Sequence, residues 1–128
     1  KLRSQEATDF KGGASVKPIA QRLDDLWRRL VKQEASYRCE KCGGRWSGTA
    51  EAHHIFSRSR RSVRWDLANG VCLCRDCHAA QRQRPVEFLE WVAVHMGPEA
   101  FEALRQRSVQ IVKRTEADLQ ELLKELGS

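Results

Sequence analysis

The spacing of hydrophobic residues predicts an amphipathic helix near the start of the chain. In the stretch "PIAQRLDDLWRRLVKQEA", which begins at Pro18, apolar side chains recur every three or four positions. These positions are Ile19, Leu23, Leu26, Trp27, Leu30 and Val31. Proline suits the first turn of a helix, where its missing N–H would have no partner in any case. We therefore predict a helix over residues 18–36, with Trp27 in the core.

The C-terminal third of the chain is also predicted to be helical. Helices over about 86–96 and 98–126 would be separated by Gly97-Pro98, with Trp91 on the apolar side of the first. The second would carry an apolar stripe. It comprises Phe101, Leu104, Ile111, Val112, Leu119, Leu122, Leu123 and Leu126. The stripe fits either packing on the helix at 18–36 or the surface of a homodimer.

Between these helical regions the pattern indicates short strands and a loop. Residues 51–56 and 69–74 read as strands, and residues 57–68 as a loop between them. Residues 75–84 favour a helix that ends at Pro85, and residues 1–17 are polar without periodicity. The fold class predicted is α+β and mainly helical. We expect four regions in one compact domain: a flexible basic arm at 1–17, then 18–36, 37–84 and 85–128.

Charge is concentrated in the middle of the chain. The net charge is +6, and residues 55–85 carry +5 while residues 86–128 carry −3. A positive stretch of this density favours a polyanionic partner, although a solvated loop would show it too. Its loop arginines are Arg58, Arg60, Arg61 and Arg64.

The cysteines predict a zinc site. The chain has five cysteines, an odd number, and it opens without a signal peptide, which argues against a disulfide framework and for a cytoplasmic protein. No apolar run is long enough for a transmembrane helix. Two C-x-x-C pairs can supply four thiolates to one structural zinc ion. They are Cys39 with Cys42 and Cys74 with Cys77. Cys72 could compete as a ligand, but packing as a small apolar residue is favoured.

Three histidines are left over once four cysteines bind the zinc. His53 and His54 are adjacent, and neighbouring side chains of a strand point to opposite faces. His78 lies in the first turn of the helix at 75–84. His53 and His78 could therefore hold a second metal ion with open coordination positions. His54, on the opposite face, could act as a general base, because the pKa of imidazole lies near neutrality.

The order of these residues resembles the HNH endonucleases of the ββα-metal group, which are built on a treble-clef zinc scaffold. The motif residues are "AHHI", Asn69 in "DLANGV" and the final histidine of "LCRDCH", and the resemblance covers about residues 37–84. It implies that His54 is the general base, that His53 and His78 bind the catalytic divalent ion, and that Asn69 orients the base or the loop before it. Asn69 could also be only a turn residue before Gly70.

The resemblance implies cleavage of DNA phosphodiester bonds with weak sequence preference, and the four loop arginines would bind the DNA backbone. Many members of the family have aspartate where this chain has His53. An imidazole ligand favours transition ions, so we expect Mn²⁺, Ni²⁺ or Co²⁺ to support activity at least as well as Mg²⁺. The segment "VRWDLANGVCLCRDCH" with "MGPEAFEAL" also resembles phage recombination endonucleases of the NinG/Rap type, which suggests a phage or prophage setting.

Two other functions remain open from the residues themselves. A treble-clef zinc finger could bind DNA without cutting it, which would explain the cysteines and arginines but not the histidines. A zinc ion could also only hold helices together in an interaction protein. Trp46 and Trp65 could stack on bases, although packing beside the zinc is favoured.

Overall fold

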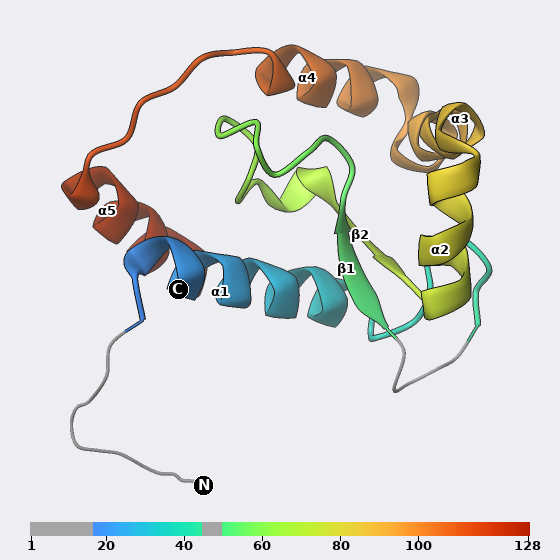
Figure 1. The fold of residues 1–128 in the computed structure, drawn as a ribbon, viewed down its shortest axis with the longest axis horizontal. Helices are drawn as coiled ribbons and strands as arrows, with labels where there is room; N and C mark the ends of the chain where they lie inside the picture. Colours follow the sequence, from blue (N-terminus) through green and yellow to red (C-terminus); the bar gives the residue numbers. More distant parts are fainter. Residues whose placement is uncertain (1–16, 45–49) are drawn as a thin grey trace, which may run out of the picture.

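The computed structural model describes residues 17–44 and 50–128, so the predicted arm up to residue 16 and Trp46 lie outside the described residues. Five α-helices, one 3₁₀ turn and a two-stranded sheet make up the described chain, which is the mainly helical α+β fold that the sequence predicts. Figure 1 shows helices on both sides of the small sheet. No helix in the described ranges is both long and apolar enough to span a bilayer.

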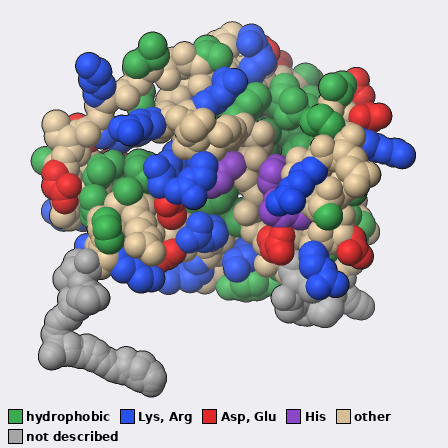
Figure 2. Space-filling view, in the orientation of Figure 1, with side chains coloured by type: hydrophobic (Ala, Val, Ile, Leu, Met, Phe, Trp, Pro, Cys, Tyr) green, Lys and Arg blue, Asp and Glu red, His purple; other side chains and the backbone are tan. Residues whose placement is uncertain are grey.

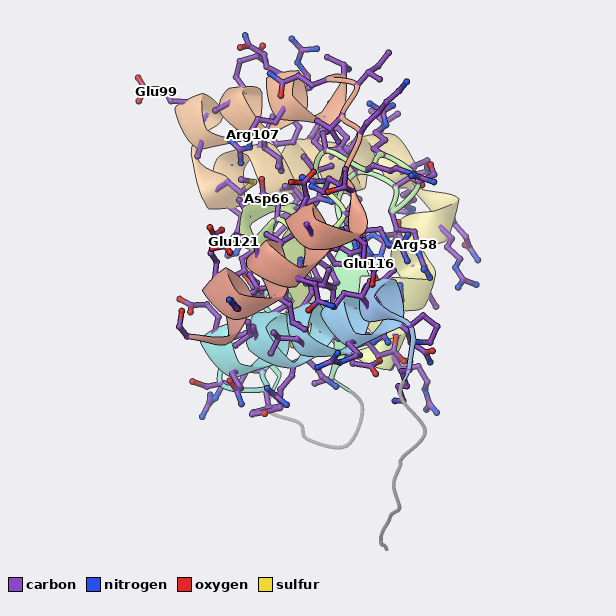
Figure 3. The ribbon with its side chains drawn as sticks, turned by 90° about the vertical axis from the view of Figure 1, so that its left-hand side faces the viewer. Arg58, Asp66, Glu99, Arg107, Glu116 and Glu121 are labelled. Atoms are coloured by element: carbon purple, nitrogen blue, oxygen red, sulfur yellow. The ribbon has the colours of Figure 1, made fainter. Side chains whose placement is uncertain are left out.

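Helix α1 (Ile19–Glu34) begins and ends close to the predicted positions and buries the predicted face. Its buried apolar residues form a core cluster with Trp65, and the last helix, α5 (Glu116–Gly127), packs against this cluster. The packing residues of α5 are Leu119, Leu122, Leu123 and Leu126. Figure 3 shows α5 lying against α1. The α5 part of the stripe thus covers α1 within the same chain, as in the first of the two arrangements that the sequence left open.

The centre of the fold is a ββα unit. Strand β1 (Glu51–His54) pairs antiparallel with β2 (Gly70–Leu73), with Glu51 opposite Leu73 and His54 opposite Gly70. Helix α2 (Arg75–Gln83) follows β2 directly. The strands are shorter than the predicted segments at 51–56 and 69–74. The chain bends directly after His54, the 3₁₀ turn η1 (Leu67–Asn69) ends directly before β2, and Cys74 already caps α2.

A second core cluster lies on the other side of the sheet. Helix α3 (Pro85–Met96) contributes Phe88 and Val92, which pack with Val71 and Leu73 of β2. Trp91 packs at the margin of this cluster and Trp27 is fully buried in the first, so both tryptophans predicted to be core are confirmed. The sheet is therefore held between α1 on one side and α2 and α3 on the other.

The prediction of one continuous helix over 98–126 is wrong. The structure has α4 (Pro98–Ser108) and α5, joined by a non-helical segment at 109–115. A capping box at Thr115 and Asp118 starts α5 anew, because each residue's side chain accepts a hydrogen bond from the other's backbone N–H. Ile111, which the stripe predicted to be buried, is 93% exposed. Apolar spacing alone could not reveal a helix start made by polar side chains.

The basic loop before η1 is attached to α4 and to the segment after it. The Ser62 hydroxyl donates to the carbonyl of Arg107 at 2.6 Å, and the Arg107 side chain donates to Asp66 at 2.9 Å. Arg114 donates to the carbonyl of Arg61 at 2.7 Å. Figure 3 shows Arg107 and Asp66 side by side. These contacts add polar anchors to a loop that also buries Val63 and Trp65.

Replacement of Gly70 by alanine should destabilise the protein, because a Cβ atom there would lie 2.4 Å from Cγ2 of Val31 and 2.8 Å from Cζ2 of Trp27. We expect the Gly70→Ala variant to lose about 1–3 kcal/mol of unfolding free energy, as overpacked cores do. Urea denaturation followed by fluorescence would measure the loss. Gly127→Ala is the control, since its Cβ would meet only Leu26 Cδ2 at 3.8 Å. An unchanged midpoint for Gly70→Ala would contradict this close packing.

Candidate active site

Four of the five cysteines form one cluster. Their Sγ atoms all lie within 4.8 Å of one another. Cys39 and Cys42 flank a tight turn after α1 that Gly43 closes with φ of +73°, a backbone conformation that favours glycine. Cys74 and Cys77 lie at the start of α2, where Cys74 caps the helix. The tetrathiolate cluster predicted from the sequence is therefore present, and its donor set suits a structural zinc ion.

Backbone amides support this cluster. The N–H of Cys42 donates to Sγ of Cys39 and the N–H of Cys77 donates to Sγ of Cys74, both at 3.4 Å. Burial tends to raise the pKa of the Cys39 thiol, but backbone hydrogen bonds, first that from Cys42, outweigh it and lower the pKa to about 7. A thiol that ionises near neutral pH is ready to bind a metal ion.

Cys72 lies outside the cluster. Its side chain is fully buried, and burial together with the nearby charge of Glu40 raises the pKa of its thiol to about 11. Its backbone N–H donates to Glu40 at 2.8 Å. Cys72 therefore behaves as a small apolar core residue, as the sequence favoured.

Strand β1 directs the two adjacent histidines to opposite sides of the sheet. His53 faces α2 and α3, where its Nδ1 lies 3.1 Å from Nε2 of His78 and its ring meets Phe88 edge to face. His54 faces α1 on the other side. Two nitrogen atoms that each lie about 2.1 Å from one metal ion are commonly separated by about the distance found between these two imidazole nitrogens. The pair His53 and His78 thus has the donor atoms and the spacing to share a metal ion.

Glu51 is a member of this group that the sequence analysis missed. Its carboxylate accepts a hydrogen bond from Nδ1–H of His78, which leaves the lone pair on Nε2 of His78 directed at His53. The pKa of His53 is lowered to about 4, chiefly by burial of the ring, so this imidazole is neutral at pH 7. Glu51 precedes His53 by two positions and therefore shares its strand face. This spacing of two positions is the sequence signal from which the role of Glu51 could have been predicted.

His54 is held by two contacts on the α1 side. Its ring stacks on the indole of Trp27 with centroids 3.8 Å apart and planes 7° from parallel. Its Nε2 lies 2.9 Å from the carbonyl oxygen of Arg64. Because a carbonyl can only accept, Nε2 carries the proton and Nδ1 keeps its lone pair. Burial lowers the pKa of His54, against the opposing effect of this hydrogen bond, so the ring is neutral at pH 7.

Asn69 is fully buried between the sheet and the loop. Its amide donates to the carbonyls of Phe56 at 2.9 Å and Val63 at 3.1 Å, and its Oδ1 accepts from the N–H of Phe56 at 2.8 Å. These three bonds join the first and last parts of the loop that separates β1 from β2. The contacts of Asn69 are with loop backbone and not with a histidine ring.

Asp24 of α1 binds much of the basic loop, a role that the sequence analysis did not foresee. Only 6% exposed, it accepts two hydrogen bonds from Arg64, at 3.0 and 2.7 Å, and one from Nε1 of Trp65 at 2.8 Å. Arg58 adds a contact at 3.1 Å. Burial tends to raise the pKa of Asp24, but these hydrogen bonds and charges outweigh it and lower the pKa. No sequence signal singles out a carboxylate whose partners lie 40 residues away.

The predicted DNA-binding arginines therefore differ in their surroundings. Arg64 and Arg58 contact Asp24, whereas Arg60 donates to Ser108 at 3.2 Å and Arg61 is exposed. Trp65 is buried, as favoured, but against α1 and not beside the cysteine cluster.

Comparison with known proteins gives one match. The model of the HNH endonuclease family matches residues 39–84, a segment that contains the four clustered cysteines, the histidine pair, Asn69 and His78. No curated protein and no solved structure matches the chain.

Substitution of a clustered cysteine should remove the zinc ion and much of the stability, because the free energy of metal binding adds to that of folding in a small core. We expect purified wild-type protein to contain zinc and Cys74→Ala to contain none, measured by plasma mass spectrometry, with a lower melting temperature. Cys72→Ala is the matched control, because Cys72 lies in β2 only two residues before Cys74 but outside the cluster, and this variant should retain its zinc. Equal zinc contents in the two variants would contradict the assignment.

Proposed function

Residues 39–84 form a domain of the HNH endonuclease family, and from this premise we propose that the chain is a metal-dependent endonuclease that hydrolyses DNA phosphodiester bonds. The observation that carries the proposal is the arrangement on β1. One strand presents His53 to His78 on one face and a neutral His54 with an available Nδ1 lone pair on the other. Both rings have fixed orientations, which catalysis needs.

His53 and His78 are the proposed ligands of the catalytic divalent ion. Their facing nitrogens and the carboxylate of Glu51 behind His78 form the carboxylate–histidine arrangement common at metal sites. When bound, such an ion supplies Lewis-acid stabilisation of the charge that develops on the phosphate oxygens. The four-cysteine cluster would hold zinc separately, as a structural site.

His54 is the proposed general base. Its Nδ1 accepts a proton from a water molecule, the water oxygen attacks phosphorus, and the bond from phosphorus to the 3′ oxygen breaks as that oxygen takes a proton from solvent water. The products are a 5′-phosphate and a 3′-hydroxyl. The carbonyl of Arg64 stabilises the Nε2–H proton and, when Nδ1 is protonated, the imidazolium. Asn69 supports this geometry by fixing the loop, which makes it a positioning residue in this proposal.

The charge around the histidines suits a DNA backbone. Figure 2 shows Lys and Arg side chains beside the histidines on one face of the molecule. Arg60 and Arg61 are exposed on the loop and would contact phosphates, as would Arg58, whose side chain is 57% exposed. Arg64 is 21% exposed and bound to Asp24, so its contribution would be chiefly structural. Contacts of this kind predict strong salt dependence and weak sequence preference.

The alternative is a zinc-finger module that binds DNA without cutting it. The cysteines and the arginines fit that function equally well. The fixed tautomer of His54 and the facing nitrogens of His53 and His78 favour the nuclease, because a binding module has no need of them. The phage or prophage setting stays a prediction from resemblance.

Incubation with supercoiled plasmid should give nicked or linear DNA when a divalent ion is present and none with a chelator. We expect Mn²⁺, Ni²⁺ or Co²⁺ to support cleavage at least as rapidly as Mg²⁺ at equal concentration, because two imidazoles favour transition ions. His54→Ala should lower the rate about 100-fold or more, the usual contribution of a general base. Gel electrophoresis over time measures both effects.

His95→Ala is the control for this assay, since His95 contacts Glu40 and Trp91 away from the site. Circular dichroism and zinc content should show that both variants are folded. A plasmid that is retarded on the gel but never cut, with any of the ions, would favour the binding module. Cleavage by folded His54→Ala at the wild-type rate would remove His54 as the base.

Glu51→Gln should weaken binding of the catalytic ion, because a neutral amide is a weaker acceptor than the carboxylate for the Nδ1–H of His78 and holds that ring less firmly. We expect about 10- to 100-fold lower affinity, as for other residues that support metal ligands. Calorimetric titration of the zinc-loaded protein with Mn²⁺ would measure it. Glu99→Gln is the control, since Glu99 points into solvent on α4 (Figure 3). Equal affinities for the two variants would show that Glu51 does not support the site.

A further inference from the structure

We infer that Asp24 and Trp27 of α1 are positioning residues for His54, although α1 lies outside the residues that match the family. The inference rests on the proposed role of His54 as the base. Asp24 and Trp27 are three residues apart and thus lie on one face of the helix, which is buried against β1 and the loop. One face of α1 therefore constrains both the plane of the His54 ring and the direction in which its nitrogens point within that plane.

Trp27 fixes the plane of the imidazole. The two rings are nearly parallel at 3.8 Å, so rotation of His54 out of this plane would collide with the indole. The indole is itself fixed, because its Nε1–H donates to the carbonyl of Asp66 at 2.9 Å and its ring is 1% exposed. The space it occupies exists only because the residue opposite His54 on β2 is Gly70.

Asp24 fixes the direction of the imidazole within that plane. It binds the side chains of two consecutive residues, Arg64 through two bonds and Trp65 through one. The backbone between those two anchored side chains carries the Arg64 carbonyl that accepts the Nε2–H of His54. If that carbonyl moved away, the reason for the proton to stay on Nε2 would be lost, and Nδ1 would no longer be consistently available.

The neighbouring residue offers a matched comparison. Asp25 has the same charge on the same helix, but its side chain is 40% exposed and contacts Lys17 at 2.9 Å and Arg28 at 2.6 Å. Within the described part of the chain, its hydrogen bonds go to neither the loop nor His54. A change of charge at Asp25 therefore reproduces the effect of Asp24→Asn on net charge without affecting the loop.

The first test is plasmid cleavage by zinc-loaded protein with Mn²⁺. We expect Asp24→Asn to lower kcat about 10- to 100-fold, the cost of a misplaced catalytic group, with little change in KM for DNA. Asp25→Asn should leave both constants unchanged. Trp27→Phe keeps an aromatic face but loses the hydrogen bond to the Asp66 carbonyl, and it should also lower kcat, by a smaller factor than Asp24→Asn. If circular dichroism shows that Asp24→Asn does not fold, the kcat of Trp27→Phe provides the test instead.

The second test does not depend on activity. Nitrogen-15 NMR of histidine-labelled, zinc-loaded protein without the second ion reports which nitrogen of His54 carries the proton. We expect a single Nε2–H tautomer in the wild type and in Asp25→Asn, and a mixture of tautomers in Asp24→Asn. Folded Asp24→Asn and Trp27→Phe with wild-type kcat and a wild-type tautomer would overturn the inference. A wild type that cuts no DNA would overturn the proposed function, while the tautomer would still decide whether α1 orients His54.

Discussion

The two-residue alternation of β1 is the constraint on which the candidate site depends. Because successive side chains of a strand point to opposite faces, Glu51 and His53 meet His78 of α2 while His54 meets Trp27 of α1. A slip of one residue in the pairing with β2 would exchange these faces and disperse both groups. The register is secured by packing, since only a glycine fits opposite His54 beneath α1.

The remainder of the fold supplies rigid supports for this short strand pair. A two-stranded sheet is marginal by itself and needs covering layers. Here α1, against which α5 packs, covers one face, α2 and α3 cover the other, and the four-cysteine cluster joins the turn after α1 to the start of α2. Zinc at that cluster would add the free energy of metal binding to that of folding. The cluster thus anchors the start of α2, the helix that carries His78.

Elements outside the family match contribute more to the site than their sequences suggest. The arginine-rich loop between β1 and η1, which lies within the match, carries the carbonyl that binds His54. Asp24 anchors it from α1, and Arg107 and Arg114 anchor it from the C-terminal side. Several acidic and basic side chains of this chain therefore hold the loop in place.

The sequence by itself determined the features that rest on short spacings. Two C-x-x-C pairs predict the thiol cluster, and strand alternation predicts different surroundings for His53 and His54, because ligand geometry and strand geometry are local. The tertiary structure alone decided the rest. The contact of the 109–115 segment with the loop and the pairing of Asp24 with Arg64 join residues 40 or more positions apart. Such contacts form only when helices pack, so no pattern along the chain records them.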